Sequence, residues 1–252
     1  MRLKLTIDRG NTAIKVALWS ADGQMLDTTI GDESMTAGAL AETIAHRHLA
    51  PGDSFAAISW CTVVASDHAE DEASLAGLAP VVRELTSRLK LPMQIEYRTP
   101  GTLGADRLAA ALGAITVAGS DRPLLVSDIG TAVTYDFVAP GPRYLGGNIA
   151  PGIGLRLRAL AAFTDALPAV SIDGGDIPLW GRTTTEAMRS GAVRGIAAEL
   201  AYYHAAAGDD AIAVLTGGSA EFLAHENILT FDYIHDPYLV HKGLFSIIKD
   251  EN

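Results

Sequence analysis

Two turn motifs, one in each half of the chain, carry the same residues in the same order. Asp8-Arg9-Gly10-Asn11-Thr12-Ala13 and Asp128-Ile129-Gly130-Thr131-Ala132 share the pattern Asp-x-Gly-(Asn)-Thr-Ala. Each motif joins one apolar, strand-like run to a second one. The spacing of the copies is domain-sized and exceeds the period of solenoid repeats, so it predicts a duplicated α/β unit. We expect domains over residues 1–119 and 120–252, with mixed sheets, flanking helices and a ligand cleft between the copies.

Hydropathy patterning predicts that each half begins with a three-strand meander and continues with alternating helices and strands. In the first half we expect strands at 3–7, 13–19, 24–30, 55–64 and 93–97, and helices at 37–49, 75–89 and 108–115. In the second half we expect strands at 124–127, 132–138, 144–149, 211–215 and 228–233, helices at 155–163, 184–207 and 239–248, a short helix after Ser219, and a Gly- and Pro-rich loop over 173–181. The helix at 75–89 is predicted from leucine and valine residues that recur every three or four positions.

The composition narrows the class of protein. Of the 252 residues, 48% are hydrophobic and 19% are charged, which is typical of a folded globular chain. A net charge of −11 argues against nucleic acid or an anionic membrane surface as a partner. No apolar run is long enough to span a membrane, and Asp8 interrupts the N-terminal apolar stretch too early for a signal peptide. Cys61 is the only cysteine and lies in an apolar run, so we expect a core thiol, no internal disulfide and a cytoplasmic protein.

The first motif suits the phosphates of a nucleoside triphosphate. Gly10 permits a tight turn and a close approach of phosphate oxygens, turn N–H groups bind anions, and Asn11 or Thr12 can donate to a phosphate. Asp8 at the strand end can hold Mg²⁺, which prefers one or two carboxylates together with phosphate oxygens. The alternative is an ordinary hairpin turn made of residues that favour turns. The occurrence of the motif at equivalent places in both halves favours the phosphate site.

Two further segments can take part in chemistry. Asp106 and Arg107 open a predicted helix, where Asp106 can accept a hydroxyl proton and Arg107 can clamp a carboxylate or a phosphate. A helix N-terminus lowers the pKa of a carboxylate, but phosphoryl transfer needs positioning more than a strong base. The alternative is an Asp that is favoured by the helix dipole and paired with Arg107. The segment Thr216-Gly217-Gly218-Ser219 can receive a flat ligand such as adenosine, or it is a simple strand–helix turn.

Together the motifs resemble those of type III pantothenate kinase, a family of the acetate/sugar kinase–Hsp70–actin superfamily. The matching segments run in family order and are Asp8-x-Gly10-Asn11-Thr12-x-x-Lys15, Gly104-Ala105-Asp106-Arg107, Asp128-x-Gly130-Thr131-Ala132-x-Thr134, Gly146-Gly147-x-Ile149-x-Pro151-Gly152, Thr184-x-Glu186-Ala187-Met188-x-Ser190-Gly191 and Thr216-Gly217-Gly218. The second and fourth segments in combination are specific to the family. The resemblance implies an α/β fold of two ribonuclease H-like (actin-like ATPase) domains. It also implies ATP-dependent phosphorylation of the pantothenate 4′-hydroxyl, the first step of coenzyme A synthesis.

The resemblance further implies roles for individual residues. The ATP-binding residues would be Asp8, Arg9, Gly10, Asn11, Thr12, Ala13, Ile14, Lys15 and Thr131, with Asp8 near Mg²⁺. Asp106 would be the general base, and pantothenate would be bound by Tyr97, Gly104, Ala105, Asp106, Arg107 and Thr184. Thr184 would act across the interface of a homodimer. Asp128 would hold the monovalent cation, K⁺ or NH₄⁺, that the family requires.

Arg9 departs from the family pattern, which has a small or aliphatic residue after the first aspartate. If its side chain points out of the hairpin, it can touch phosphate. If it points into the domain, the first phosphate site is in question.

Two other functions remain open at this point. One is a catalytically silent relative that binds nucleotide and regulates a partner, and the presence of Asp8, Asp106 and Asp128 argues against it. The other is another phosphotransferase or sugar kinase of the same superfamily. Tyr97 and Arg107 suit an amphipathic substrate with a carboxylate better than a polyol.

Overall fold

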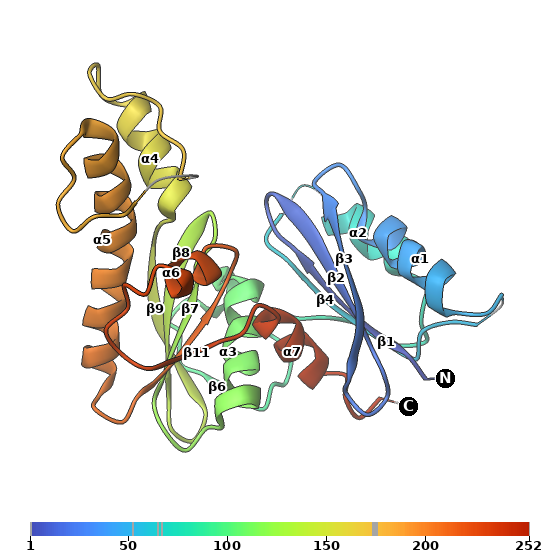
Figure 1. The fold of residues 1–252 in the computed structure, drawn as a ribbon. Helices are drawn as coiled ribbons and strands as arrows, with labels where there is room; N and C mark the ends of the chain where they lie inside the picture. The colour runs from blue at the N-terminus through green and yellow to red at the C-terminus, as the bar shows by residue number, and fades with distance from the viewer. Residues whose placement is uncertain (1, 52, 65, 67, 173–175, 252) are drawn as a thin grey trace. The chain divides into compact units, whose positions relative to one another are not determined.

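The computed structural model describes residues 2–51, 53–64, 66, 68–172 and 176–251 (Figure 1). The chain divides into two compact units, one formed by Met1–Val117 with Tyr238–Asn252 and the other by Ala118–Pro237. Each unit contains a mixed β-sheet with helices packed against it.

The first unit is built on a five-stranded sheet in the order β3-β2-β1-β4-β5. Its strands are β1 (Lys4–Arg9), β2 (Ala13–Trp19), β3 (Met25–Asp32), β4 (Ala57–Thr62) and β5 (Val82–Glu84). The first three form the predicted antiparallel meander, and β4 and β5 extend the sheet in parallel from β1. Because side chains alternate along a strand, Leu5 and Ile7 point to one face of the sheet, whereas Thr6 and Asp8 point to the other.

Helices cover both faces of this first sheet. The apolar face packs against α1 (Ala37–His48), which begins after Thr36, and α1 in turn packs against α2 (His68–Leu75). The polar face carries α7 (Leu239–Ser246), where the hydroxyl of Thr6 lies 2.9 Å from Nδ1 of His241. The indole N–H of Trp19 also donates to this hydroxyl at 2.9 Å. Burial lowers the pKa of His241 to about 3, so this histidine is neutral near pH 7.

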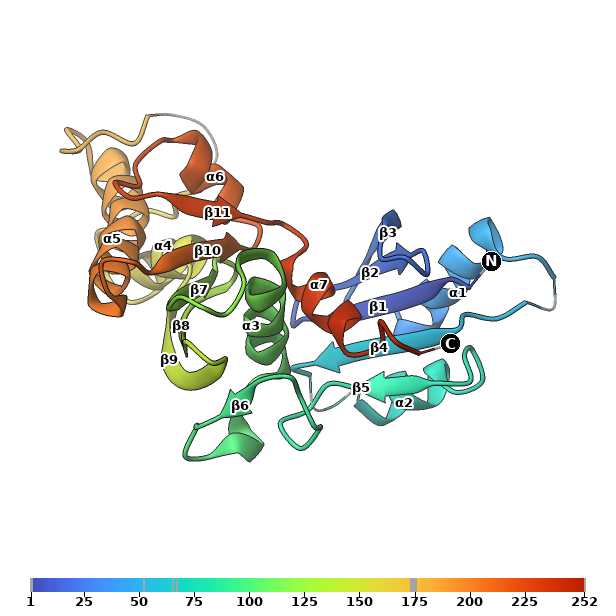
Figure 2. The same cartoon turned by 90° about the horizontal axis from the view of Figure 1, so that it is seen from below.

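The C-terminal helix lies in the first unit, which corrects the prediction that residues 238–252 belong to the second domain. It runs beside α3 (Ala105–Ala118), and Figure 2 shows the two helices together. Glycine makes this packing possible, since a Cβ on Gly243 would lie 1.9 Å from the carbonyl oxygen of Ala109. This contact between distant segments is not visible in the local sequence pattern. The segment before α3 contains only the short strand β6 (Gln94–Ile95) and a 3₁₀ turn, Pro100–Thr102.

The second unit repeats the strand arrangement of the first. Its strands are β7 (Leu124–Asp128), β8 (Ala132–Ala139), β9 (Arg143–Pro151), β10 (Ile212–Thr216) and β11 (Tyr233–His235). They lie in the order β9-β8-β7-β10-β11, with the same antiparallel and parallel pairings as in the first sheet. The predicted duplication of an α/β unit is therefore confirmed.

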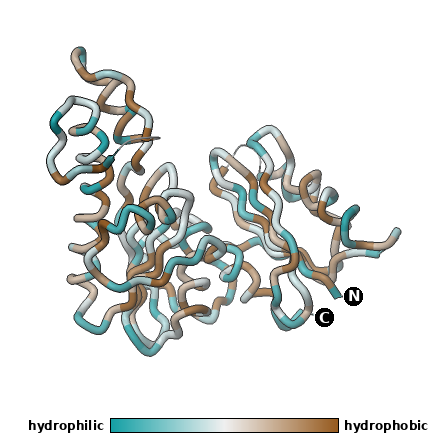
Figure 3. The backbone as a smooth tube through the Cα atoms, in the orientation of Figure 1, coloured by the Kyte–Doolittle hydropathy of each residue, from teal (hydrophilic) through white to brown (hydrophobic). Residues whose placement is uncertain are grey.

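Three helices complete the second unit: α4 (Ile153–Ala162), α5 (Thr184–Ala207) and α6 (Ala220–His225). Their apolar side chains pack against β7, β8 and β10 in one core. Figure 3 shows hydrophobic stretches along the strands of each unit, where the cores lie. None of the helices in the described part of the chain is both long and apolar enough to cross a membrane.

Two predicted elements are wrong. The helix expected at 75–89 does not form. Helix α2 ends at Leu75, because Gly77 has a positive φ of 86° and Pro80 follows, and the chain then enters β5. The strand expected at 228–233 begins only at Tyr233, and Ile228 and Phe231 pack on the core from the connection before it. Part of the loop expected at 173–181, residues 173–175, lies outside the described residues.

Candidate active site

Asp8 lies near the end of β1, on the polar face of the first sheet. Its neighbours across the sheet are Lys15 on β2 and Cys61 on β4, whose Sγ donates to Oδ1 of Asp8 at 3.7 Å. Burial raises the pKa of Asp8; the charge of Lys15 and the thiol lower it, and the charge of Asp106 raises it further. Asp8 and Asp106 therefore lie close enough for their charges to interact, as two carboxylates of one site would.

The turn after Asp8 is a tight hairpin with an exposed tip. The N–H of Gly10 donates to the carbonyl of Ala13 at 3.0 Å, and Asn11 and Thr12 at the tip are exposed. Lys15 is also exposed, so its ammonium group is accessible to an anion. Ile14, by contrast, is fully buried in the core, so the structure does not expose it to a ligand.

Arg9 points into the domain. Its guanidinium donates to the carbonyl oxygens of Met35 at 2.5 Å and Glu33 at 3.2 Å, and its Nε lies 3.3 Å from Oδ2 of Asp71. The side chain is therefore unable to contact ATP as the sequence interpretation implied. The hairpin itself is intact, because Arg9 keeps its register with Ile14 across the turn.

Asp106 lies in the first turn of α3, after Gly104. Its Oδ1 accepts from the N–H of Arg107 at 2.8 Å, and a Cβ on Gly104 would lie 2.4 Å from the same oxygen. Burial raises the pKa of Asp106, although the N–H and the charge of Arg107 oppose the shift. The expectation of a lowered pKa at a helix N-terminus is therefore wrong here, because desolvation outweighs the backbone hydrogen bonds and the charge of Arg107. A raised pKa makes Asp106 a stronger base than an exposed aspartate.

Arg107 and Tyr97 form the second part of this site. The guanidinium carbon of Arg107 lies 5.9 Å from the centroid of the Tyr97 ring, a cation–π distance, and only 5% of Arg107 is exposed. Ala105 and Gly104 are half-buried beside them. A positive group backed by an aromatic ring is suited to a ligand with a carboxylate and an apolar part.

The second unit holds an equivalent hairpin at the end of β7. The N–H of Gly130 donates to the carbonyl of Ala132 at 2.9 Å, as Gly10 does to Ala13. The N–H of Asp128 donates to the hydroxyl of Thr134 at 3.3 Å. Thr131 at the tip is exposed. The two motifs that repeat in the sequence therefore form corresponding hairpin turns in the two units, and the first turn is longer by one residue, Asn11.

Gly217 holds the chain close to Asp128. It has a φ of 93°, and a Cβ there would lie 2.3 Å from Oδ1 of Asp128 and 2.6 Å from the N atom of Ile129. The glycine is thus required for the packing of the β10–α6 turn against the Asp128 hairpin. Thr184, the first residue of α5, is exposed. The predicted cleft between the domains stays a prediction.

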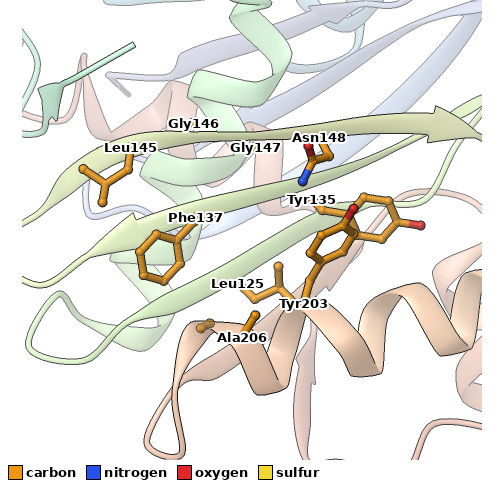
Figure 4. Close-up of a pocket in the computed structure, with 10 residues that line it drawn as sticks. Leu125, Tyr135, Phe137, Leu145, Gly146, Gly147, Asn148, Tyr203 and Ala206 are labelled. Atoms are coloured by element: carbon orange, nitrogen blue, oxygen red, sulfur yellow. The ribbon is translucent and has the colours of Figure 1, made fainter.

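The second unit also contains an open, mainly apolar pocket of about 330 Å³. Tyr203 and Ala206 of α5 line one side, and Phe137 of β8 and Leu145 of β9 line the other (Figure 4). Gly146 and Gly147 of the family motif border this pocket, but it contains none of the residues predicted to bind ATP or pantothenate.

Sequence reasoning missed two contributors to the site. Cys61 was interpreted as a core residue, and it is fully buried, but its thiol also contacts Asp8. Its place in β4, parallel to β1, is the signal that would have paired it with Asp8. Asp71, the partner of Arg9, carries no such signal, because it lies on a helix far along the chain.

Comparisons with known proteins identify the family of the chain. A family model described as type III pantothenate kinase matches residues 4–206. The type III pantothenate kinase of Porphyromonas gingivalis is 35% identical over 255 residues, which cover 99% of each chain. That of Azobacteroides pseudotrichonymphae is 44% identical over 167 residues, which cover 66% of each chain.

Among solved structures, a putative 2-dehydro-3-deoxygalactonokinase from Sinorhizobium meliloti superposes with a TM-score of 0.61 at 18% identity, covering 98% of each chain. This likeness confirms the predicted fold of duplicated ribonuclease H-like domains, as found in actin-like ATPases and sugar kinases. The sequence match over most of the chain identifies the family within that fold, and this chain belongs to the type III pantothenate kinases.

Proposed function

We propose that this chain transfers the γ-phosphoryl group of ATP to the 4′-hydroxyl of pantothenate, the first step of coenzyme A synthesis. The family match supports the reaction, and the interacting carboxylates Asp8 and Asp106 supply the groups that it needs. In this proposal Asp106 accepts the hydroxyl proton as the oxygen attacks phosphorus, and ADP leaves. The single observation that carries the role of Asp106 is its raised pKa at a fixed position in the first turn of α3.

ATP is proposed to bind through the two hairpins. In the first, the exposed Asn11 and Thr12 and the ammonium group of Lys15 are available to phosphate oxygens. In the second, Thr131 occupies the equivalent exposed position. Arg9 is left out of this set because its guanidinium is bound within the first unit.

Pantothenate is proposed to bind at the start of α3. The buried guanidinium of Arg107 is suited to its carboxylate, and the Tyr97 ring is suited to its apolar part. Gly104 and Ala105, which are half-buried beside these side chains, are proposed to contact the same ligand. Thr184 is proposed to complete the site from a second copy of the chain.

Two kinds of cation belong to the proposal. Asp8 fits Mg²⁺, because its carboxylate is desolvated and repelled by Asp106, and a bound cation would relieve both penalties. Bound there, Mg²⁺ would neutralise phosphate charge. Asp128 fits K⁺ or NH₄⁺, since its carboxylate is held close to the main chain at Gly217 and Ile129. There a monovalent cation would offset the charge of that carboxylate.

A homodimer is proposed from the surface of the second unit. Phe163, Leu179 and Trp180 are 87%, 63% and 80% exposed, and large apolar groups of this kind commonly mark an interface. They lie on the segments between α4 and α5, and α5 begins with Thr184. A cytoplasmic location is part of the same proposal, because ATP is supplied there.

A panel of phosphoryl acceptors tests the function. The purified chain is incubated with ATP, Mg²⁺ and K⁺ and with pantothenate, other hydroxy acids or sugars in turn, and ADP release is measured. We expect release only with pantothenate. Preference for a sugar would support another kinase of the superfamily, and ATP binding without turnover on any acceptor would support a non-catalytic relative. Either result would overturn the proposal.

A further inference from the structure

Asp8 and Arg9 are adjacent in β1, but their side chains point to opposite faces of the first sheet. Asp8 lies on the polar face, whereas Arg9 follows Leu5 and Ile7 onto the face that packs against α1. Arg9 is 3% exposed. Burial of a guanidinium is costly unless it is paired and hydrogen-bonded. The groups that bind the Arg9 side chain therefore indicate its structural role.

The contacts of Arg9 converge on the connection between β3 and α1. Two of its N–H groups donate to the carbonyl oxygens of Glu33 and Met35, which belong to this connection. Its Nε is 3.3 Å from Oδ2 of Asp71, which is 1% exposed. One guanidinium thus donates hydrogen bonds to two carbonyl oxygens and forms an ion pair with Asp71 behind the sheet.

Asp71 links Arg9 to the helices α1 and α2. Its other oxygen, Oδ1, accepts from the N–H of Ala37 at 2.7 Å, at the start of α1. Its own carbonyl accepts from the hydroxyl of Ser74 at 2.8 Å, and the Ser74 hydroxyl accepts from the N–H of Gly38 at 2.9 Å. The ion pair of Arg9 and Asp71 therefore joins the end of β1 to the starts of both α1 and α2.

Arg9 is also the last residue of β1 before the exposed hairpin tip. Its carbonyl accepts from the N–H of Val63 at 3.2 Å, and Arg9 pairs with Ile14 across the turn. Beyond it, Asn11 and Thr12 are exposed. The direction in which the tip leaves the sheet therefore depends on how firmly Arg9 is held.

We propose that Arg9 and Asp71 are positioning residues for the ATP-binding hairpin: their buried ion pair fixes the hairpin from the face of the sheet opposite the reaction. This inference rests on the proposed binding of ATP at the hairpin. It assigns to Arg9 a role behind the site in place of the direct phosphate contact that the sequence suggested.

A double-mutant cycle tests the proposal. Arg9→Met, Asp71→Asn and the double variant are compared with the unaltered chain for KM of ATP, KM of pantothenate, kcat, melting temperature and Kd of ATP. Asp71→Asn keeps an oxygen for the N–H of Ala37 and removes only the charge. We expect each single change to raise the KM and Kd of ATP on the order of tenfold, with the KM of pantothenate changed little. The double variant should be no worse than the poorer single variant, because the two residues act as one unit.

Arg9→Lys is the conservative variant. Its ammonium group keeps the charge opposite Asp71 but lacks the planar fork that reaches Glu33 and Met35 as well, so its ATP KM should lie between those of the unaltered chain and Arg9→Met. Arg156→Met is the matched control, because it removes an ion pair with Glu199 between α4 and α5 in the second unit. It should lower the melting temperature without raising the KM of ATP.

Several results would overturn the positioning role. They are an unchanged ATP KM in the folded variants, additive effects in the double variant, an equal rise in the Arg156→Met control, and failure of both single variants to fold. Failure of the proposed function can be distinguished from failure of the positioning role. If the unaltered chain binds ATP but does not phosphorylate pantothenate, the double-mutant cycle can still be measured through the Kd of ATP.

Discussion

Gly104 and Asp106 fit together so closely that a Cβ on Gly104 would lie 2.4 Å from Oδ1 of Asp106. Gly104→Ala should therefore displace the proposed base and lower kcat about 100-fold, the cost of misplacing a reacting group by about 1 Å. Gly101→Ala is the control, because a Cβ there meets nothing within 4 Å. Steady-state kinetics of both variants test this, and equal kcat values would contradict a constraint at Gly104.

Asp106→Asn should lower kcat about 100-fold or more without loss of the fold, because the amide cannot accept the hydroxyl proton. Its effect on stability follows from the raised pKa. Near pH 7 the buried carboxylate is charged at a cost to the folded state, so the melting temperature of the variant should exceed that of the unaltered chain. The difference should vanish below about pH 3.9, where the carboxyl is protonated in both states. Asp121→Asn, at an exposed position, is the control.

The pH dependence of kcat/KM should report the two buried carboxyl groups of the site, Asp106 and Asp8. Because burial raises the pKa of Asp106, activity should begin to fall at a pH clearly above 3.9 as the solution is acidified. Circular dichroism at each pH separates this loss from acid unfolding. An acid limb at or below 3.9 would show that Asp106 is not desolvated as described.

The stability of the first unit should decrease as the pH falls from about 6.5 towards 3. His241 has a folded pKa of about 3, whereas a histidine in the unfolded chain has a pKa near 6.5, so acid protonates the unfolded chain first. Urea unfolding followed by tryptophan fluorescence at several pH values measures this trend. His241→Gln should flatten it, and His225→Gln should not, because the side chain of His225 is 87% exposed. An equal slope in all three chains would contradict the buried neutral histidine.

The elements that the sequence predicted best are those specified by local pattern. Strand β2 and helix α5 begin and end where they were expected, because turn residues and caps mark their ends; the hydroxyl of Thr183, for example, accepts from the N–H of Glu186. The helix predicted at 75–89 was inferred from apolar residues at helical spacing, but these residues belong to different elements: Leu75 lies in α2 and Val82 in β5. Val82 pairs with Ile58 in a parallel strand, and only the partner strand reveals this.

The candidate site was predictable to the extent that it repeats within the chain. The hairpins at Asp8 and Asp128 were found by comparing the two halves, and the structure builds both as corresponding turns. The inward orientation of Arg9 follows from alternation along β1, but its partner Asp71 depends on how α2 packs. The raised pKa of Asp106 was also unpredictable, because it depends on burial and not on the helix terminus alone.

The close approach of Gly217 to Asp128 gives a final prediction, on the response to monovalent cations. Gly217→Ala would place a Cβ 2.3 Å from Oδ1 of Asp128 at a φ of 93°, so the carboxylate must move and the turn is strained. If Asp128 holds K⁺, the ratio of rates in K⁺ and Na⁺ buffers should approach one in this variant. Gly218→Ala should keep the ratio of the unaltered chain, because a Cβ at Gly218 meets nothing within 4 Å. A normal ratio in Gly217→Ala, with the melting temperature showing a folded protein, would remove Asp128 as the cation ligand.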